Sequence, residues 1–199
     1  MLGYDPTILA LLIVVSYLVG SIPTGLLLGK VYGVDVRKEG SGNIGATNLY
    51  RTVGRKVGAA TLLGDCLKGL LPVLLVKHGG FAPDFAVWVG LAAFCGHVFS
   101  LFLKFKGGKG VATALGVFLG LSPLAVLPAV VVFVLLMAVW RYVSLGSIGA
   151  SLSMPVSAAL IYKSGSLTLA TLLIAVIIVV RHYENIQRLI DGSESRFKA

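Results

Sequence analysis

Three polar segments of the chain contain the residues whose types and spacing could support chemistry. They read DVRKEGSGNIGATNLYR at 35–51, KFKGGKGVAT at 104–113 and RHYENIQRL at 181–189. Each segment combines basic side chains with glycines or with amide and hydroxyl groups. Glycines let a ligand approach the backbone, successive backbone N–H groups can form an anion-binding nest, and Lys and Arg neutralise the bound charge. The pattern therefore predicts a site for an anionic ligand.

The last of these segments carries a pair of polar residues at helical spacing. His182 and Asn185 lie at i and i+3, so they share one face of a helix. Arg181 disfavours the charged form of the neighbouring imidazole, which suits a neutral hydrogen-bonding or basic group. A purely structural histidine that caps the helix is the alternative. His78 and His97 have no comparable support.

Nucleotide-binding patterns are present only by coincidence. Residues 40–45 match G-x-G-x-x-G, and Asp65 lies twenty residues beyond, but that fingerprint requires a preceding strand and a βαβ unit. The segment 106–110 resembles a P-loop in composition, yet no G-x-x-x-x-G-K-[ST] occurs. The sequence therefore does not support nucleotide hydrolysis.

Thiol and metal chemistry are not indicated either. Cys66 and Cys95 lie inside apolar stretches, so neither suggests a disulfide framework or a metal cage. The sequence contains no recognisable Ser-His-Asp arrangement, and no histidine is followed by Asp in an H-x-x-x-x-D signature. We expect no metal and no cofactor.

The composition shows which elements must position these segments. Of 199 residues, 57% are hydrophobic and 13% are charged, and the mean hydropathy is +0.94. A soluble domain has about 25% charged residues and about 45–50% apolar residues. This excess of apolar residues excludes a soluble enzyme and a disordered chain, and it predicts an integral membrane protein.

Helices long enough to cross a bilayer need about 20 apolar residues each. The first apolar run is interrupted by GSIPTG at 20–25 and lacks a basic leader and a cleavage site, so it predicts a retained helix. The run 110–140 is too long for one span, and Ser122-Pro123 is a plausible break. The predicted spans are 8–28, 57–76, 85–103, 110–121, 124–140, 143–161 and 167–180.

The basic residues predict the orientation of these seven spans. With the N-terminus outside, fourteen of them fall on the inner side: Lys30, Arg37, Lys38, Arg51, Arg55, Lys56, Lys104, Lys106, Lys109, Arg141, Arg181, Arg188, Arg196 and Lys198. Only Lys77 and Lys163 fall outside, as the positive-inside rule requires. Asp65 and Lys68, inside a span, are expected to face the bundle and pair. We expect one all-α, polytopic domain over 1–199, with the C-terminus inside.

The three polar segments resemble, in order and spacing, the bacterial acyl-phosphate:glycerol-3-phosphate acyltransferases, the PlsY family. The resemblance rests on GSGNIGATN with Arg51, on KFKGGKGVAT and on H-x-x-N-I-x-R-L, and it extends to GSIPTG and to RYVSLGSI at 141–148. It covers nearly the whole chain. It implies a seven-helix membrane enzyme of the bacterial inner membrane, with its site on the cytoplasmic face, which begins phospholipid biosynthesis.

The resemblance also implies roles for individual residues. It implies catalytic roles for Ser41, Lys109, His182 and Asn185, and substrate binding by these four together with Gly42, Asn43, Asn48, Arg51, Lys106, Gly107, Gly108 and Ser147. Other interpretations stay open: Arg51 as an interfacial anchor, Lys106 and Lys109 as snorkelling side chains, and Ser147 as a helix-packing residue. The whole set could also be basic loops that contact lipid headgroups, although headgroups require no glycines.

The implied reaction moves an acyl group from acyl phosphate to the sn-1 hydroxyl of glycerol 3-phosphate, and releases inorganic phosphate and lysophosphatidic acid. A mixed anhydride has a good leaving group, so direct attack needs no acyl-enzyme. The proton acceptor is either His182 or a substrate phosphate. Partners are the two substrates, the bilayer and, as a candidate, the enzyme that forms acyl phosphate, with no nucleic acid. The main alternatives are a small-anion transporter or channel and a lipid-binding scaffold.

Overall fold

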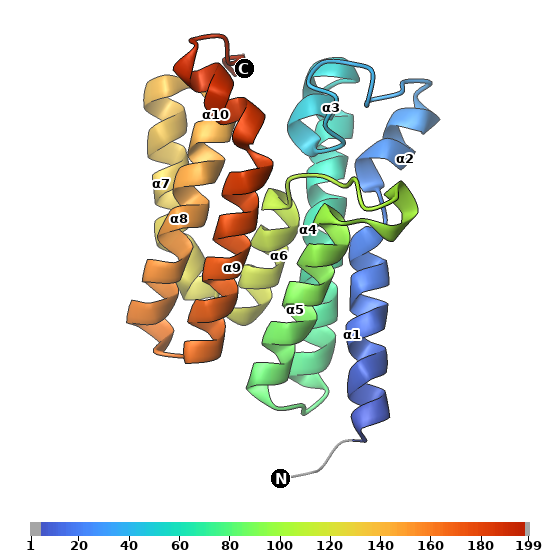
Figure 1. Cartoon of the computed structure of the whole chain (residues 1–199), viewed down its shortest axis with the longest axis vertical. Helices are drawn as coiled ribbons and strands as arrows, with labels where there is room; N and C mark the ends of the chain where they lie inside the picture. The colour runs from blue at the N-terminus through green and yellow to red at the C-terminus, as the bar shows by residue number, and fades with distance from the viewer. Residues whose placement is uncertain (1–4, 198–199) are drawn as a thin grey trace. The chain divides into compact units, whose positions relative to one another are not determined.

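The computed structural model describes residues 5–197, and all regular secondary structure in that range is helical (Figure 1). The chain divides into two compact units, Met1–Leu121 and Ser122–Ala199. The helices of the first unit are α1 (Pro6–Ser21), α2 (Thr24–Val31), α3 (Ala46–Thr52), α4 (Arg55–His78), α5 (Pro83–Val98), the 3₁₀ turn η1 (Leu101–Leu103) and α6 (Val111–Leu121). Those of the second unit are α7 (Pro123–Trp140), α8 (Val143–Tyr162), α9 (Gly165–Arg181) and α10 (Tyr183–Ile190).

In the first unit, α1, α4, α5 and α6 run side by side (Figure 1). Helix α1 packs on α5, and α4 packs on both α5 and α6. The first apolar run, which was predicted as one helix over 8–28, breaks at Ile22-Pro23 within GSIPTG, because proline has no N–H to continue the helical ladder. Helix α2 then continues the run after this break.

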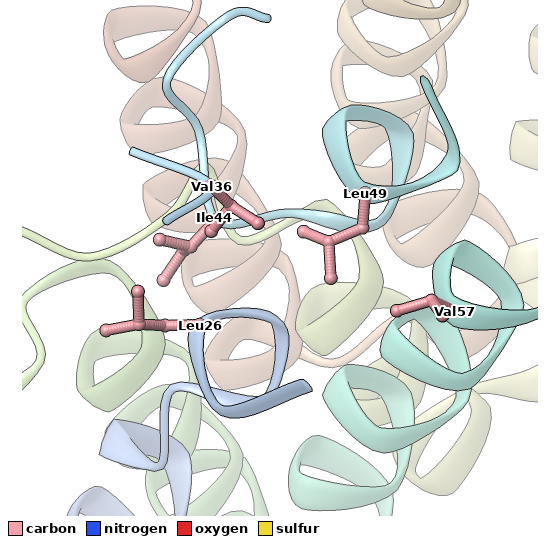
Figure 2. Packing of buried hydrophobic residues seen from close by; sticks show 5 residues of the cluster. All are labelled: Leu26, Val36, Ile44, Leu49 and Val57. Atoms are coloured by element: carbon pink, nitrogen blue, oxygen red, sulfur yellow. The ribbon is translucent and has the colours of Figure 1, made fainter. Parts of the chain in front are cut away.

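The polar segment before α3 is held to its unit by a small apolar cluster (Figure 2). Leu26 of α2, Val36 and Ile44 of the connecting segment, Leu49 of α3 and Val57 of α4 are all buried there. Partly buried Leu103 of η1 packs against the same cluster. Both basic segments of the first unit, 35–51 and 104–110, therefore lie at the same end of that unit (Figure 1).

In the second unit, α8 packs against both α7 and α9. Pro123 at the first position of α7 favours a helix start there, because the first N–H groups of a helix have no partner within the helix and proline has none to leave unpaired. At the other end of the unit, α10 follows α9 with a bend of 57° at His182. The chain then turns back after α10, and the N–H of Phe197 donates to the carbonyl of Arg141 at 2.7 Å.

The predicted spans correspond to helices, except that 8–28 is divided between α1 and α2 and 85–103 is divided between α5 and η1, and the predicted break at Ser122-Pro123 is confirmed. Five helical segments of the described chain are long and apolar enough to cross a membrane: Pro6–Val31, Arg55–His78, Pro83–Leu103, Pro123–Trp140 and Val143–Tyr162. Helix α9 passes the same test only together with the bent α10, and α6 has only 11 residues. The protein is thus all-helical with five to six candidate spans, while seven crossings and the orientation of the termini stay predictions.

Candidate active site

The first polar segment is organised by one buried amide. Asn48 donates from Nδ2 to the carbonyls of Val36 at 2.9 Å and Glu39 at 3.1 Å, and its Oδ1 accepts the N–H of Ser41 at 2.9 Å. Both amide hydrogens are used within the protein, and the side chain is only 3% exposed. Asn48 therefore shapes the segment from within, and its implied contact with substrate stays a prediction.

The other site residues of this segment sit on the shaped backbone. The side chains of Ser41 and Arg51 are exposed, and Asn43 is partly exposed. Gly42 has a φ of +69°, a left-handed conformation that favours glycine, and its N–H donates to the carbonyl of Glu39 at 3.0 Å. A hydroxyl, an amide and a guanidinium thus lie along a short stretch whose shape is fixed by Asn48.

The glycine-rich segment between η1 and α6 forms a second feature at this end of the unit, and we call residues 106–110 the glycine turn. The N–H of Gly107 donates to Val98 O at 3.1 Å, and that of Gly108 to His97 O at 3.2 Å. The expectation of an open anion nest is therefore wrong for these two N–H groups. Lys106 is exposed, Lys109 is partly exposed, and the turn leads directly into α6.

The start of helix α6 lies next to the two lysines of the glycine turn and adds partial positive charge that favours a bound anion. It begins at Val111, directly after Gly110. The N–H groups in the first turn of a helix have no partner within the helix, and they carry the positive end of its dipole. A phosphate at the glycine turn would therefore meet Lys106, Lys109 and the start of α6.

An ion pair lies inside the first unit. Lys68 Nζ is 2.8 Å from Asp65 Oδ1 on the same helix, and both side chains are almost fully buried. This confirms the predicted pairing of the two residues. His97 Nδ1 lies 3.7 Å from the same carboxylate oxygen, so a histidine without support in the sequence joins the pair.

In the second unit, His182 lies at the bend between α9 and α10 and is 3% exposed. Its Nδ1 is 2.8 Å from the carbonyl oxygen of Ile178. Because a carbonyl can only accept, Nδ1 carries the proton, and in the neutral ring Nε2 is then the acceptor. His182 also ends one helix and begins the next, so it has a structural role at the bend.

Asn185 is held by a carboxylate from the end of the chain. Glu194 Oε1 accepts hydrogen bonds from Asn185 Nδ2 and from Ser144 Oγ, both at 2.7 Å, and Oε2 accepts one from Arg188 Nε at 2.8 Å. Burial raises the pKa of the Glu194 carboxyl, but these hydrogen bonds outweigh it and hold the pKa below its ordinary value of 4.5. The carboxylate therefore stays ionised and orders three polar side chains.

Ser147 lies one turn inside α8 and is buried. Its hydroxyl donates to Val143 O, four residues earlier, at 2.8 Å. This bond uses the hydrogen and leaves the oxygen lone pairs as acceptors. Both interpretations of Ser147, as a substrate ligand and as a packing residue, are consistent with this geometry.

Two residues of these arrangements were not predicted from the sequence. Glu194 lies in a tail, 191–199, that has two acidic and two basic residues, so its composition gave no signal that could have singled it out. His97 precedes the glycine turn by nine residues but has no local pattern of its own. Both act through contacts between segments that are distant in the chain.

Comparison with known proteins decides the family. The sequence model of the family Glycerol-3-phosphate acyltransferase matches residues 10–192, which span both units. The chain belongs to this family. Relatives named glycerol-3-phosphate acyltransferase are 69% identical over 184 residues in Trichlorobacter lovleyi (92% of this chain, 95% of the relative) and 61% identical over 189 residues in Geobacter sulfurreducens (95% and 97%).

A solved member of the glycerol-3-phosphate acyltransferase family has the same fold. The crystal structure of PlsY, an integral membrane glycerol 3-phosphate acyltransferase, superimposes with a TM-score of 0.91 at 40% identity in its glycerol 3-phosphate form, and covers 96% of each chain. Its lysophosphatidic acid form gives a TM-score of 0.89 at the same identity, over 96% of this chain and 95% of that one. The resemblance found in the sequence is confirmed, and the chain is an integral membrane protein of this acyltransferase family.

Proposed function

We propose that this acyltransferase moves a fatty acyl group from acyl phosphate to the sn-1 hydroxyl of glycerol 3-phosphate, and releases lysophosphatidic acid and inorganic phosphate. The reaction would be the first step of membrane phospholipid biosynthesis. The observation that carries the proposal is the glycine turn with its two lysines, which opens α6 in a chain of this family. Such a turn suits a phosphate leaving group, because its lysines and the helix start stabilise the negative charge that develops on the departing phosphate.

The first unit supplies the groups that would hold phosphate. Arg51 offers a planar fork of donors for a phosphate, and Ser41 and Asn43 offer neutral donors on the segment that Asn48 fixes. Lys106 and Lys109 would neutralise the donor phosphate at the glycine turn. Positioning two phosphates in this way supplies much of the rate enhancement when the leaving group is already good.

For the second unit, taken by itself, we propose catalytic roles for His182 and Asn185. With Nδ1 of His182 committed to Ile178 O, Nε2 is the ring nitrogen that would accept a proton. Asn185, oriented by Glu194, would hold a polar group of the substrate. A substrate phosphate oxygen is the competing proton acceptor. In either case the hydroxyl attacks the acyl carbon, phosphate leaves with the bonding electron pair, and no acyl-enzyme forms.

The donor is tested with purified full-length protein and radiolabelled glycerol 3-phosphate, supplied in turn with acyl phosphate, acyl-CoA and acyl carrier protein thioester. We expect lysophosphatidic acid and an equal amount of inorganic phosphate from acyl phosphate alone. A thioester carrier needs a docking surface that this chain, with most of its residues in apolar helices, has little room to provide. Product from acyl-CoA at the rate seen with acyl phosphate would contradict the proposed donor.

We further propose seven membrane crossings in the inner membrane, with the polar segments in the cytoplasm and loops 77–82 and 163–164 outside. Single cysteines at Ser193 and at Gly165, both exposed, test this in a background with Cys66 and Cys95 replaced by Ala. An impermeant thiol reagent added to intact cells should label position 165 and not 193. Labelling of position 193 from outside would contradict seven crossings.

A further inference from the structure

Three ionisable side chains lie buried inside the apolar helices of the first unit. Asp65, Lys68 and His97 are 2%, 6% and 4% exposed. Lys68 Nζ and His97 Nδ1 both approach the same carboxylate oxygen of Asp65, at 2.8 Å and 3.7 Å. Burying such groups in an apolar surrounding is costly, and ionisable residues within membrane helices commonly mark functional sites.

The group is anchored at one side to the broken first span. Lys68 Nζ donates to Ile22 O at 2.7 Å, and this carbonyl lies at the break between α1 and α2. Ser100 Oγ donates to Ser21 O at 2.6 Å beside it. The carboxylate of Asp65 is therefore held in place by a lysine that is itself fixed to the backbone of another helix.

On the other side, the group supports the glycine turn. The carbonyl of His97 accepts the N–H of Gly108, and the imidazole lies directly against the α-carbon of Gly108. A methyl group added at Gly108 would overlap Nε2 and approach Cε1 to 3.1 Å and Cδ2 to 3.3 Å. The backbone φ of Gly108 is not left-handed, so its conformation does not require glycine. The His97 ring occupies the space that a side chain at position 108 would need, and this contact accounts for the glycine.

We propose that Asp65, Lys68 and His97 are positioning residues for the glycine turn, and that through it they set the affinity for the phosphate of the acyl donor. This inference rests on the proposed function, in which the turn binds that phosphate. Lys68 holds the carboxylate of Asp65, and that carboxylate orients the His97 ring. The ring in turn limits how closely the backbone of Gly108 can approach α5. Gly108 lies between Lys106 and Lys109 in the chain, so its position affects both lysines. A structural ion pair alone would stabilise the helices without any effect on the donor.

The first test is the variant His97→Ala in the full-length protein. We expect the KM for acyl phosphate to rise by about 10- to 100-fold, since a misplacement of about 1 Å can cost about 100-fold. The KM for glycerol 3-phosphate should change by less than about twofold, because the segment 35–51 is held by Asn48 instead. An unchanged KM for acyl phosphate would overturn the inference, and so would equal rises for both substrates. His78→Ala, which alters an exposed histidine, is the matched control.

The second test uses the contact between His97 and Gly108 in a double-mutant cycle. Gly108→Ala alone should raise the KM for acyl phosphate, because its methyl group meets the ring. In the His97→Ala background the same change should have little further effect, because the ring is gone. Equal fold-changes in the two backgrounds would overturn the inference. Gly165→Ala, at a glycine whose added methyl group meets nothing within 4 Å, is the matched control.

A third test removes the two buried charges together, so that neither is left unpaired. Asp65→Asn/Lys68→Gln should raise the KM for acyl phosphate in protein that still elutes as a folded species. A lower unfolding temperature with unchanged KM would assign the pair to stability alone and overturn its positioning role.

Two further measurements separate this inference from the proposed function. If the wild-type chain transfers no acyl group from acyl phosphate, the proposed donor fails. If wild-type turnover is normal and the variants match it, only the positioning inference fails. Binding of inorganic phosphate, followed by its effect on the unfolding temperature, is independent of turnover and should weaken about tenfold in His97→Ala. Equal phosphate binding by the variant and the wild type would contradict the inference whichever donor is used.

Discussion

The polar segment of the first unit and that of the second unit hold their candidate site residues in different ways. In the segment 35–51, a neutral amide, Asn48, binds backbone groups and leaves the side chains of Ser41 and Arg51 exposed. In the second unit, His182 and Asn185 are themselves buried, and they are fixed by a carbonyl and by the carboxylate of Glu194.

This difference indicates which site residues can be replaced without loss of stability of the fold. Exposed cations on a backbone that other groups shape contribute charge to a ligand and little to stability. Buried polar residues tied to a carboxylate contribute to both, because removing one partner leaves another buried group unsatisfied. The second unit should therefore couple activity to stability and to pH, whereas the segment 35–51 should not.

The largest expected effect comes from two cations of the first unit, Arg51 and Lys109. Arg51→Ala and Lys109→Ala should each lower kcat/KM by about 100-fold or more, since a charged hydrogen bond contributes about 1.5–3 kcal/mol and an unpaired phosphate costs more. The unfolding temperature should stay near that of the wild type. Arg51→Lys should remain impaired because its bidentate fork is lost. Lys30→Ala is the control. Near-normal kinetics of both Ala variants would instead support Arg51 as an interfacial anchor and Lys109 as a snorkelling side chain.

A smaller effect on activity, with a loss of stability, is expected from Glu194→Gln. The neutral side chain no longer gives charged acceptors to Ser144, Asn185 and Arg188, and we expect about a tenfold fall in kcat/KM, equivalent to about 1.4 kcal/mol. The unfolding temperature should fall in the same variant. Glu184→Gln, at a carboxylate that is 80% exposed, is the matched control. Loss of activity without loss of stability would contradict the coupling.

The same carboxylate predicts how stability depends on pH. A carboxyl whose pKa falls on folding contributes stability above its unfolded value, and that contribution is lost as the pH falls through the folded value. For Glu194 the loss should begin near its ordinary value of 4.5 and continue at lower pH. Unfolding temperatures of the wild type and Glu194→Gln should therefore stay apart above pH 4.5 and converge only as the pH is lowered below that value. A constant difference between them would assign the acid sensitivity to other groups.

The smallest expected effect distinguishes the two interpretations of Ser147. Ser147 and Ser151 are both buried on α8 and donate to carbonyls of their own helix, so Ser151 is an internal comparison. If Ser147 also accepts a hydrogen bond from substrate, Ser147→Ala should lower kcat/KM by about fivefold, equivalent to about 1 kcal/mol, while Ser151→Ala should not. Equal effects of the two variants would favour helix packing.

The sequence alone was sufficient for features that depend on neighbouring residues. Hydropathy over about 20 residues located the apolar helices, Ser122-Pro123 marked a break, and i, i+3 spacing predicted that Asp65 and Lys68 pair. The three motifs were sufficient for the family. In each case the information is local, since helix formation and side-chain spacing along a helix depend on residues only a few positions apart.

The tertiary structure alone decided what holds the motifs in place. Glu194 binds Ser144 from fifty residues away, and no periodicity in the sequence connects them. Packing of α5 against the glycine turn placed His97 under Gly108 and used the turn's N–H groups internally. The first segment's own fold turned Asn48 inward to serve the backbone. Such contacts follow from how helices and loops pack, because any buried donor or acceptor must find a partner among the groups that packing brings near.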